Sequence, residues 1–216
     1  PAARLAASDL AEAGVEVIDA APPGFDLAVS TAFVDATDGR RAVVSGSGRL
    51  PVLAEPTGPD LAGVDVVLLD GHHPSLARAV VRAAAASAVP VVVDAGSHKP
   101  VFAEVFGRAN DVICSADYVH PEGLVPWNLL GLGPELVAVS HGAGDLEWRS
   151  ADTAGRITPP VVAAVDTLGA GDVLHGGFSF ALASGLDRPH ALEFGVRVAS
   201  IRVQHLGPFA WRTALR

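Results

Sequence analysis

Four short apolar runs constrain the fold of this chain more than any other feature. They are "VDVVLLDG" from residue 64, "VPVVVDAG" from residue 89, "DVICS" from residue 111 and "ELVAVSHGAG" from residue 135. Helical spacing at 74–88, and plausible helices at 100–108 and near 121–131, separate them. Continuous apolar strands that alternate with amphipathic helices are typical of a mostly parallel sheet with helices on both faces. The sequence therefore predicts an α/β protein.

The regions on either side of these runs have different patterns. Residues 3–13 have helical spacing and end at Gly14, and "VEVID" reads as a short strand. Two apolar stretches flank the turn signal "ATDGR", which predicts an antiparallel hairpin. We interpret residues 27–50 as a small β-hairpin lid on a single α/β domain that spans 1–216.

The C-terminal third predicts short antiparallel strands over 145–165 and two closing helices. The helices are expected at 170–184 and about 188–205. The run around Val161, Val162 and Val165 resembles a strand that leads into a glycine-rich stretch.

Charge and cysteine content exclude several classes of function. The chain carries 15 Lys and Arg against 24 Asp and Glu, so nucleic acid and anionic membrane surfaces are poor partners. The single cysteine, Cys114, excludes an intramolecular disulfide and a cysteine-based zinc site, and its apolar neighbours predict a core position. No apolar run reaches the roughly 18 residues that a membrane helix needs. We expect a cytoplasmic protein.

Polar residues follow the expected strands at the points where they end. In open α/β sheets ligands bind beyond the carboxyl ends of the strands, so these residues are candidates for a site. Capping of the following helices is the alternative role for any one of them. The clearest examples are Asp70, Asp94, Ser115, Ser140 and Asp166.

The stretch "DTLGAGD" at 166–172 gives a sharper indication of chemistry. Gly169, Ala170 and Gly171 place successive N–H groups at the start of the 170–184 helix, where unpaired donors and the helix dipole favour an anion. Asp172 follows in the first turn, where it could take a proton from a hydroxyl group that attacks a bound phosphoryl group. The alternative is a glycine-rich loop in which Asp172 is only a helix-start charge.

Other nucleotide and metal patterns are absent from the sequence. It contains neither G-x-x-x-x-G-K-[ST] nor G-x-G-x-x-G, which excludes a P-loop enzyme and a dinucleotide-binding fingerprint. His72 and His73 are adjacent and cannot easily share one metal ion, so we expect loop residues there and no protein metal site.

"DTLGAGD" resembles the signature of the PfkB (ribokinase-like) carbohydrate kinases. The hairpin "STAFVDATDGRR", "VDAG" at 93–96 and "VSHGAG" at 139–144 follow in that family's order. "DVICSAD" at 111–117 and the closing "FGVRVASIRVQHLG" at 194–207 are similar to the ketohexokinase-like branch. The resemblance implies a ribokinase-like fold that uses ATP and Mg²⁺, with the N-terminal part of the fold expected to be missing.

The resemblance also implies a role for each matching residue. Asp172 would be the general base at the acceptor hydroxyl, and Gly169, Ala170 and Gly171 would form the anion hole. Asp166 and Thr167 would shape the loop between sugar and nucleotide, with Asp166 and Asp172 facing the sugar and Thr167 the nucleotide. The remaining nucleotide-binding residues would be Ser140, Gly142, Gly144 and Ala199.

The sequence departs from the family pattern at one further point. Many members carry Asn-x-x-Glu where this chain has Ser115-Ala116-Asp117-Tyr118, which changes the expected arrangement around Mg²⁺. We predict an ATP-dependent kinase of a small carbohydrate such as a ketohexose. The alternatives are a nucleoside kinase of the same fold and a truncated, non-catalytic nucleotide-binding relative. The apolar alternation at 28–44 (Ala28, Phe33, Val43) is either the face of a homodimer formed through the lid or a cover over the chain's own active site.

Overall fold

The computed structural model describes residues 2–25, 27–34, 41–44, 56 and 58–215. The chain divides into two compact units, Pro1–Pro56 and Thr57–Arg216. The single-domain organisation stays a prediction. In the part of the chain that the structure describes, no helix is both long and apolar enough to cross a membrane.

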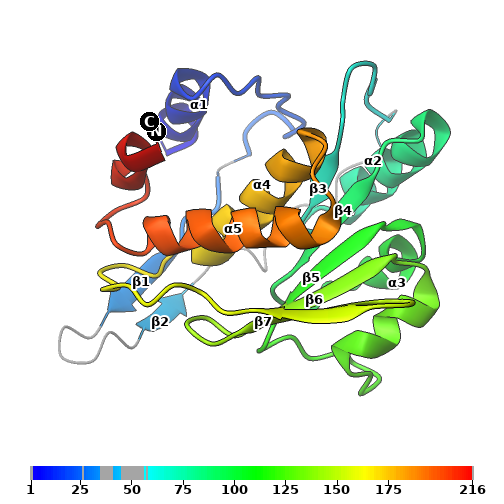
Figure 1. Ribbon diagram of the computed structural model, residues 1–216. Coiled ribbons are helices and arrows are strands. Elements are labelled where there is room, and N and C mark those ends of the chain that lie inside the picture. Colours follow the sequence, from blue (N-terminus) through cyan, green and yellow to red (C-terminus); the bar gives the residue numbers. More distant parts are fainter. Residues whose placement is uncertain (1, 26, 35–40, 45–55, 57, 216) are drawn as a thin grey trace. The chain divides into compact units, whose positions relative to one another are not determined.

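The described residues of the first unit form helix α1 and the strand pair β1–β2 (Figure 1). Helix α1 spans Ala2–Glu12, as its sequence spacing predicts. Strand β1 (Thr31–Val34) pairs antiparallel with β2 (Arg41–Val44), which confirms the predicted hairpin. Its turn and residues 45–50 lie outside the described residues, and the lid function stays a prediction.

The strand predicted at "VEVID" is wrong. Residues 15–20 adopt no regular structure, and the side chains of Val15, Val17 and Ile18 are exposed. A strand needs a neighbour for its backbone hydrogen bonds, and none of the described residues pairs with this segment.

The second unit is built on a six-stranded sheet with the order β3-β4-β5-β6-β7-β8. The first four strands are parallel to one another, and the last two are antiparallel. This confirms the mostly parallel sheet. The strands are β3 (Val67–Leu69), β4 (Val91–Ala95), β5 (Asp111–Ser115), β6 (Leu136–Ser140), β7 (Leu146–Ser150) and β8 (Ala154–Ile157).

Helices connect and cover these strands as the sequence predicts, with local differences. The segment near 121–131 forms a 3₁₀ helix that starts only at Pro126, and the helix at 100–108 is a short α-helix continued by a 3₁₀ turn. The helices are α2 (Pro74–Ser87), α3 (Phe102–Val105), η2 (Phe106–Arg108), η3 (Pro126–Leu132), α4 (Ala170–Ala183), α5 (Arg188–Arg202) and η4 (Ala210–Leu215).

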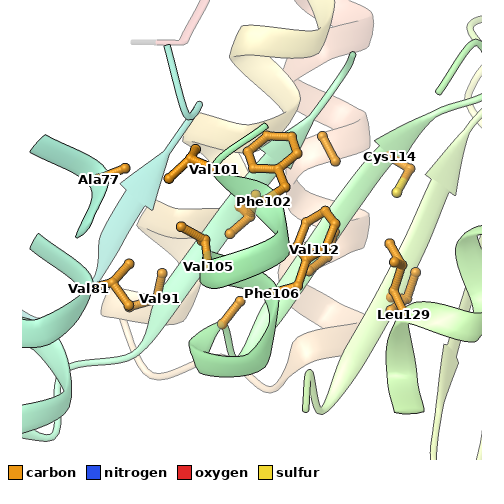
Figure 2. Packing of buried hydrophobic residues seen from close by; sticks show 14 of the residues in the cluster. Ala77, Val81, Val91, Val101, Phe102, Val105, Phe106, Val112, Cys114 and Leu129 are labelled. Atoms are coloured by element: carbon orange, nitrogen blue, oxygen red, sulfur yellow. The ribbon is translucent and has the colours of Figure 1, made fainter. Parts of the chain in front are cut away.

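Alternating residues of the central strands face two separate cores. Val91 and Val93 pack with α2 and α3 on one face of the sheet, where Phe102 and Phe106 are fully buried (Figure 2). Val92 points to the opposite face, into the core that α4 and α5 cover. Both faces of β4 are therefore buried, which explains why its sequence is continuously apolar rather than alternating.

Helices α4 and α5 lie side by side and approach closely through two glycines (Figure 1). A Cβ on Gly177 would lie 3.0 Å from Cα of Gly195, and a Cβ on Gly195 would lie 2.7 Å from the carbonyl oxygen of Leu174. Gly177, which follows the "DTLGAGD" stretch, and Gly195 therefore allow the two helices to pack closely.

The segment that precedes α4 is not a strand. Residues 158–165 have no regular structure apart from a bend, and Val161 is fully exposed. Its valines favour a strand locally, but among the described residues its backbone pairs only at its end, where the N–H of Val165 donates to the carbonyl of Val203. The chain thus reaches α4 as an extended loop.

Candidate active site

The start of α4 leaves several backbone N–H groups without a protein partner. Gly169 is the N-cap in the left-handed conformation, with φ 75°, and no side chain caps the helix. The Ala170 N–H makes a long bond of 3.3 Å to the Thr167 carbonyl. For the N–H groups of Gly169, Gly171 and Asp172, the described part of the chain supplies no acceptor. This is the donor arrangement that binds anions at helix starts.

There is open space beside these donors. A Cβ added to Gly171 would meet no heavy atom within 4 Å. Asp172 occupies the first turn, and its side chain is exposed. A phosphoryl group can therefore approach the amides with a carboxylate beside it.

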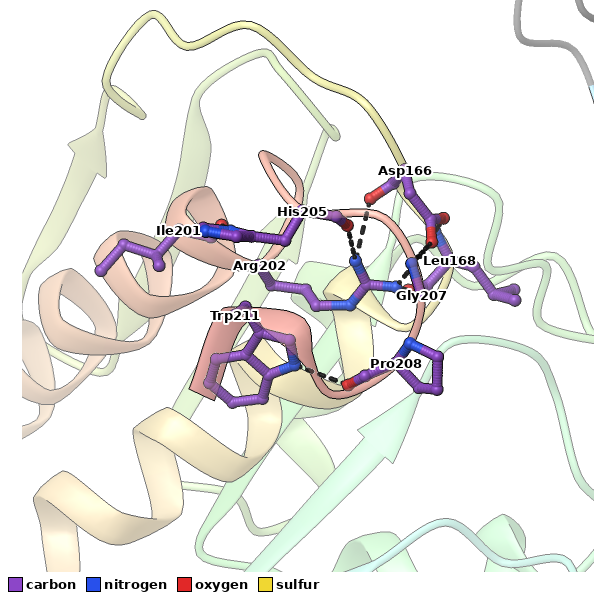
Figure 3. A network of polar contacts seen from close by, with 8 residues as sticks. All are labelled: Asp166, Leu168, Ile201, Arg202, His205, Gly207, Pro208 and Trp211. Atoms are coloured by element: carbon purple, nitrogen blue, oxygen red, sulfur yellow. Dashed lines mark hydrogen bonds and ion pairs between the residues drawn. The ribbon is translucent and has the colours of Figure 1, made fainter. Parts of the chain in front are cut away.

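An ion pair between the buried Arg202 and the partly exposed Asp166 holds the loop that leads into α4 (Figure 3). The Arg202 guanidinium lies 3.1 Å from the Asp166 carboxylate and donates to the Leu168 carbonyl at 2.6 Å. Asp166 also accepts from the N–H groups of Leu168 and Gly207. The hydrogen bond from the Leu168 N–H contributes most, and with the bonds from Arg202 and Gly207 and the Arg202 charge it holds the pKa of Asp166 below its ordinary value.

Asp166 is therefore engaged by its own chain. Its role in shaping a loop between sugar and nucleotide and its contact with a sugar both stay predictions. Thr167 is exposed, and its carbonyl is the acceptor for Ala170.

A cavity of about 430 Å³ adjoins the start of α4. The ends of β3 and β4 and the first turns of α4 meet there, so that Asp70, Asp94 and Asp172 line one space although they lie far apart in the sequence. Leu68 and Leu76 supply part of an apolar wall. A site with an apolar wall and a few convergent polar groups suits a small polar ligand.

Asp70 is held within this cavity by its neighbour His72. Its carboxylate accepts from the His72 N–H at 3.0 Å and lies 2.9 Å from the imidazole Nδ1. Burial acts to raise the pKa of Asp70, but these two contacts and the nearby positive charges together lower it. Asp70 is thus kept ionised.

Sequence reasoning missed His175, which lies one turn after Asp172 and also lines the cavity. The residue is buried, with Nδ1 2.6 Å from the Gly171 carbonyl oxygen and 3.3 Å from the Asp94 carboxylate. Its spacing of three residues from Asp172 was a usable signal, because such residues share one helix face.

Three of the residues assigned to the nucleotide, Ser140, Gly142 and Gly144, lie at the end of β6 and in the turn that follows it. The Ser140 hydroxyl points to the Cys114 carbonyl at 3.4 Å, Gly142 has φ 61°, and the Gly144 N–H closes a turn onto His141. In the structure they form the turn that links β6 to β7, at the same sheet edge as Asp94.

A second pocket of about 370 Å³ lies between the segment after β8 and α5. Ile157, Pro160, Val196 and Arg197 are among the residues that line it. Ala199, one helical turn after Val196, packs against the core instead, so its predicted contact with adenine stays a prediction.

The described residues contain no group of three or more His, Cys, Asp or Glu side chains that could hold a metal ion. Cys114 is buried as predicted, and burial raises the pKa of its thiol to about 12. A thiol of that kind is inert at neutral pH.

Comparison with known proteins places this geometry in a family. Residues 60–212 match the family described as pfkB family carbohydrate kinase. The chain is 35% identical over 85 residues to an adenosine kinase of Schizophyllum commune, and 29% identical over 122 residues to a ribokinase of Bacillus subtilis. These matches cover 36% and 55% of this chain but only 25% and 41% of the two relatives.

A solved structure shows the same fold over a longer stretch. An E. coli protein assigned as ribokinase II, in complex with ATP and Mg²⁺, superposes with a TM-score of 0.72 at 20% identity. The superposition covers 95% of this chain and 74% of that protein. The ribokinase-like fold is thereby confirmed, whereas the ketohexokinase-like branch stays a prediction.

Proposed function

Because this chain belongs to the pfkB family of carbohydrate kinases, we propose that it transfers the γ-phosphate of ATP to a hydroxyl group of a small carbohydrate. The observation that carries the proposal is the start of α4. Unpaired N–H groups, an open approach at Gly171 and the exposed Asp172 carboxylate all lie there beside one cavity.

The proposed mechanism follows from these groups. The N–H groups of Gly169, Gly171 and Asp172 stabilise the negative charge that develops on the transferred phosphoryl group. Asp172 accepts the proton of the attacking hydroxyl, and the deprotonated oxygen attacks the γ-phosphorus as the bond to the leaving ADP breaks. General-base assistance of this kind is worth roughly 10²–10⁴-fold in rate. Phosphoryl transfer is otherwise positioning and electrostatics.

We assign the nucleotide to the second pocket and to the β6–β7 turn. The apolar surfaces of Ile157, Pro160 and Val196 suit a flat base. The glycines at 142 and 144 have no side chain to obstruct the phosphates, which lie toward the start of α4 in this proposal.

The residues present fit a Mg²⁺ ion that is carried by the nucleotide. Asp70 and Asp94 provide carboxylate oxygens on the cavity, which are ligands that Mg²⁺ takes directly or through water, and Mg²⁺ rarely uses an all-protein cage. When bound, the ion would neutralise charge on the phosphates. Asn-x-x-Glu is absent at 115–118, so these two aspartates are the candidates in the second unit.

The acceptor class is the finer part of the proposal. Three carboxylates line the cavity, which suits a neutral polyhydroxy compound such as a ketohexose. A nucleoside is the second candidate, because an adenosine kinase is among the relatives. The lid over 27–50, a homodimer through it and a cytoplasmic location stay predictions.

The test measures ADP release with Mg·ATP across ketohexoses, aldoses, ribose and nucleosides. Turnover with one acceptor that is lost in Asp172→Asn would support the kinase and identify its substrate. ATP binding without turnover on any acceptor would favour the non-catalytic relative. Unchanged turnover in Asp172→Asn would remove this residue as the base.

A further inference from the structure

Arg202 is a buried arginine in the last turn of α5 that the proposed mechanism does not use. Its side chain is 3% exposed. Burial of a charged group is costly unless hydrogen-bond partners surround it. The acceptors around the guanidinium group therefore indicate what this residue holds in place.

The two terminal nitrogens of Arg202 meet four oxygen atoms (Figure 3). Nη1 donates to the His205 carbonyl at 2.8 Å and to the Asp166 carbonyl at 3.3 Å. Nη2 donates to the Asp166 carboxylate at 3.1 Å and to the Leu168 carbonyl at 2.6 Å. Because each terminal nitrogen of a guanidinium carries two hydrogens, every one of these N–H groups has its own acceptor.

One of these contacts leads directly to the phosphate site. The Leu168 carbonyl and the Gly169 N–H belong to the same planar peptide unit, in which the two bonds point in opposite directions. Arg202 holds the carbonyl oxygen, so the Gly169 N–H points away from the guanidinium. That N–H is one of those at the start of α4 for which the described part of the chain supplies no acceptor. A charged donor on the carbonyl also polarises the peptide, which strengthens its N–H as a donor.

Among the described residues, polar contacts rather than apolar burial hold this loop. The Thr167 side chain is exposed, and that of Leu168 is 51% exposed. The Asp166 carboxylate accepts from the Gly207 N–H at 3.0 Å, and the Asp166 N–H donates to the Val203 carbonyl at 3.1 Å. The loop is therefore attached to the end of α5 and the turn after it, and Arg202 is at the centre of that attachment.

We propose that Arg202 is a positioning residue for phosphoryl transfer, which fixes the Leu168–Gly169 peptide so that the Gly169 N–H faces the transferred phosphoryl group. The inference rests on the proposed function for its catalytic part, but not for the order that Arg202 gives to the loop. It links the end of α5 to the start of α4 through a side chain that itself touches no reacting atom.

The first experiment needs no activity. In the ¹⁵N-labelled wild-type chain, the backbone order parameters of Leu168 and Gly169 should be those of a rigid backbone, about 0.85, and in Arg202→Met they should fall below about 0.6. Arg188→Met is the matched control, because it removes the arginine at the other end of α5 that also binds an aspartate. It should leave the loop rigid. A loop that is as rigid in Arg202→Met as in the wild type would overturn the proposal, whether or not the chain is a kinase.

The second experiment measures kcat and KM at a temperature at which both variants are folded. We expect Arg202→Met to lower kcat roughly 10²-fold, because the phosphoryl group and its donors lose their alignment. KM for the acceptor should change little, because Arg202 does not line the cavity. Arg188→Met should retain kcat although it is less stable. Equal losses of kcat in the two variants would indicate a merely structural role and overturn the proposal.

Arg202→Lys keeps the proposal testable if the methionine variant does not fold. Lysine retains the charge opposite Asp166, but its three donors come from one nitrogen, so they cannot satisfy all the oxygen atoms that the planar guanidinium reaches. We expect kcat to fall about tenfold, roughly the worth of one hydrogen bond to a charged group. A folded lysine variant with the kcat and the loop order of the wild type would overturn the proposal.

The two experiments separate this inference from the proposed function. If the wild-type chain phosphorylates no acceptor, the proposed function fails and the order parameters alone decide. Loss of loop order in Arg202→Met but not in Arg188→Met would then still support the positioning of the loop by Arg202. Equal loop order in both variants would overturn it.

Discussion

Helices α4 and α5 pack against each other on one face of the sheet, yet they begin in opposite ways. At the start of α5, Asp187 accepts from the His190 N–H at 3.0 Å, and Pro at the second position has no N–H to satisfy. At the start of α4, Gly169 offers no side chain, and the N–H groups of Gly169, Gly171 and Asp172 have no acceptor within the described structure.

The side chains in the two first turns differ in the same way. Arg188 of α5 is anchored to the buried Asp111 at 2.5 Å and to Glu135 at 3.0 Å, so it fastens the helix to the sheet. Asp172 of α4 is exposed beside a cavity. Where the protein itself caps and anchors a helix start, as in α5, the contacts stabilise the fold. Where the N–H groups of a helix start have no protein acceptor and lie beside a cavity, as in α4, they are available to bind a ligand.

The largest expected effect is a loss of activity when the first turn of α4 is changed, which the matched change at the start of α5 should not cause. Asp172→Asn should lower phosphoryl transfer roughly 10²–10⁴-fold, because the proton acceptor is lost. The melting temperature should not change, since the side chain is exposed. Asp187→Asn is the matched control at the other helix start, because asparagine also caps a helix and activity should persist. Equal losses of activity in both variants would contradict the comparison.

Removal of the α5 anchor should instead cost stability. Arg188→Met leaves the Asp111 carboxylate buried without its partner, and loss of one member of a buried pair costs about 3–5 kcal/mol. Urea unfolding measures this change. The double variant Arg188→Met with Asp111→Leu should recover much of the loss. A single variant as stable as wild type would show that the pair does not hold α5 to the sheet.

Asp111 also predicts a pH dependence of stability. Burial raises its pKa from 3.8 to about 6 in the folded state, although Arg188 opposes the rise. The folded state therefore binds the proton more tightly, and this contribution is present below about pH 4 and lost as the pH rises through about 6. Its size is at most about 3 kcal/mol. Unfolding free energies of wild type and Asp111→Asn across this window should differ in slope, and parallel curves would refute the assignment.

The smallest effect concerns the contact between the two helices. Gly195→Ala places a Cβ 2.7 Å from the Leu174 carbonyl oxygen and should cost about 1–3 kcal/mol through overpacking. Gly176→Ala is the control within α4, because its Cβ meets nothing within 4 Å. Thermal melts should show a loss for the first and no loss for the second. A stable Gly195→Ala variant would mean that the helices can separate at little cost.

The sequence was sufficient to predict the sheet core and the start of α4. Runs such as 91–95 are apolar at every position because both faces are buried, and that pattern is local. The glycines at 169 and 171 indicate a helix start without a side-chain cap. Both features can be read from neighbouring residues alone.

Long-range pairing could not be predicted in this way. His175 meets Asp94 only because α4 crosses the end of β4, although Asp94 lies some 80 residues earlier in the chain. The valine-rich stretches at 15–19 and 161–165 have strand propensity but lack a neighbouring strand in the described structure. Local preference is overridden where the fold supplies no partner.

The most direct test of the central claim compares the backbone amides of both helix starts. In a ¹⁵N-labelled sample titrated with Mg²⁺ and a non-hydrolysable ATP analogue, we expect large shifts for the amides of Gly169, Gly171 and Asp172. The His190 amide at the start of α5 should not respond. Saturable binding that leaves the three α4 amides unchanged would contradict the account.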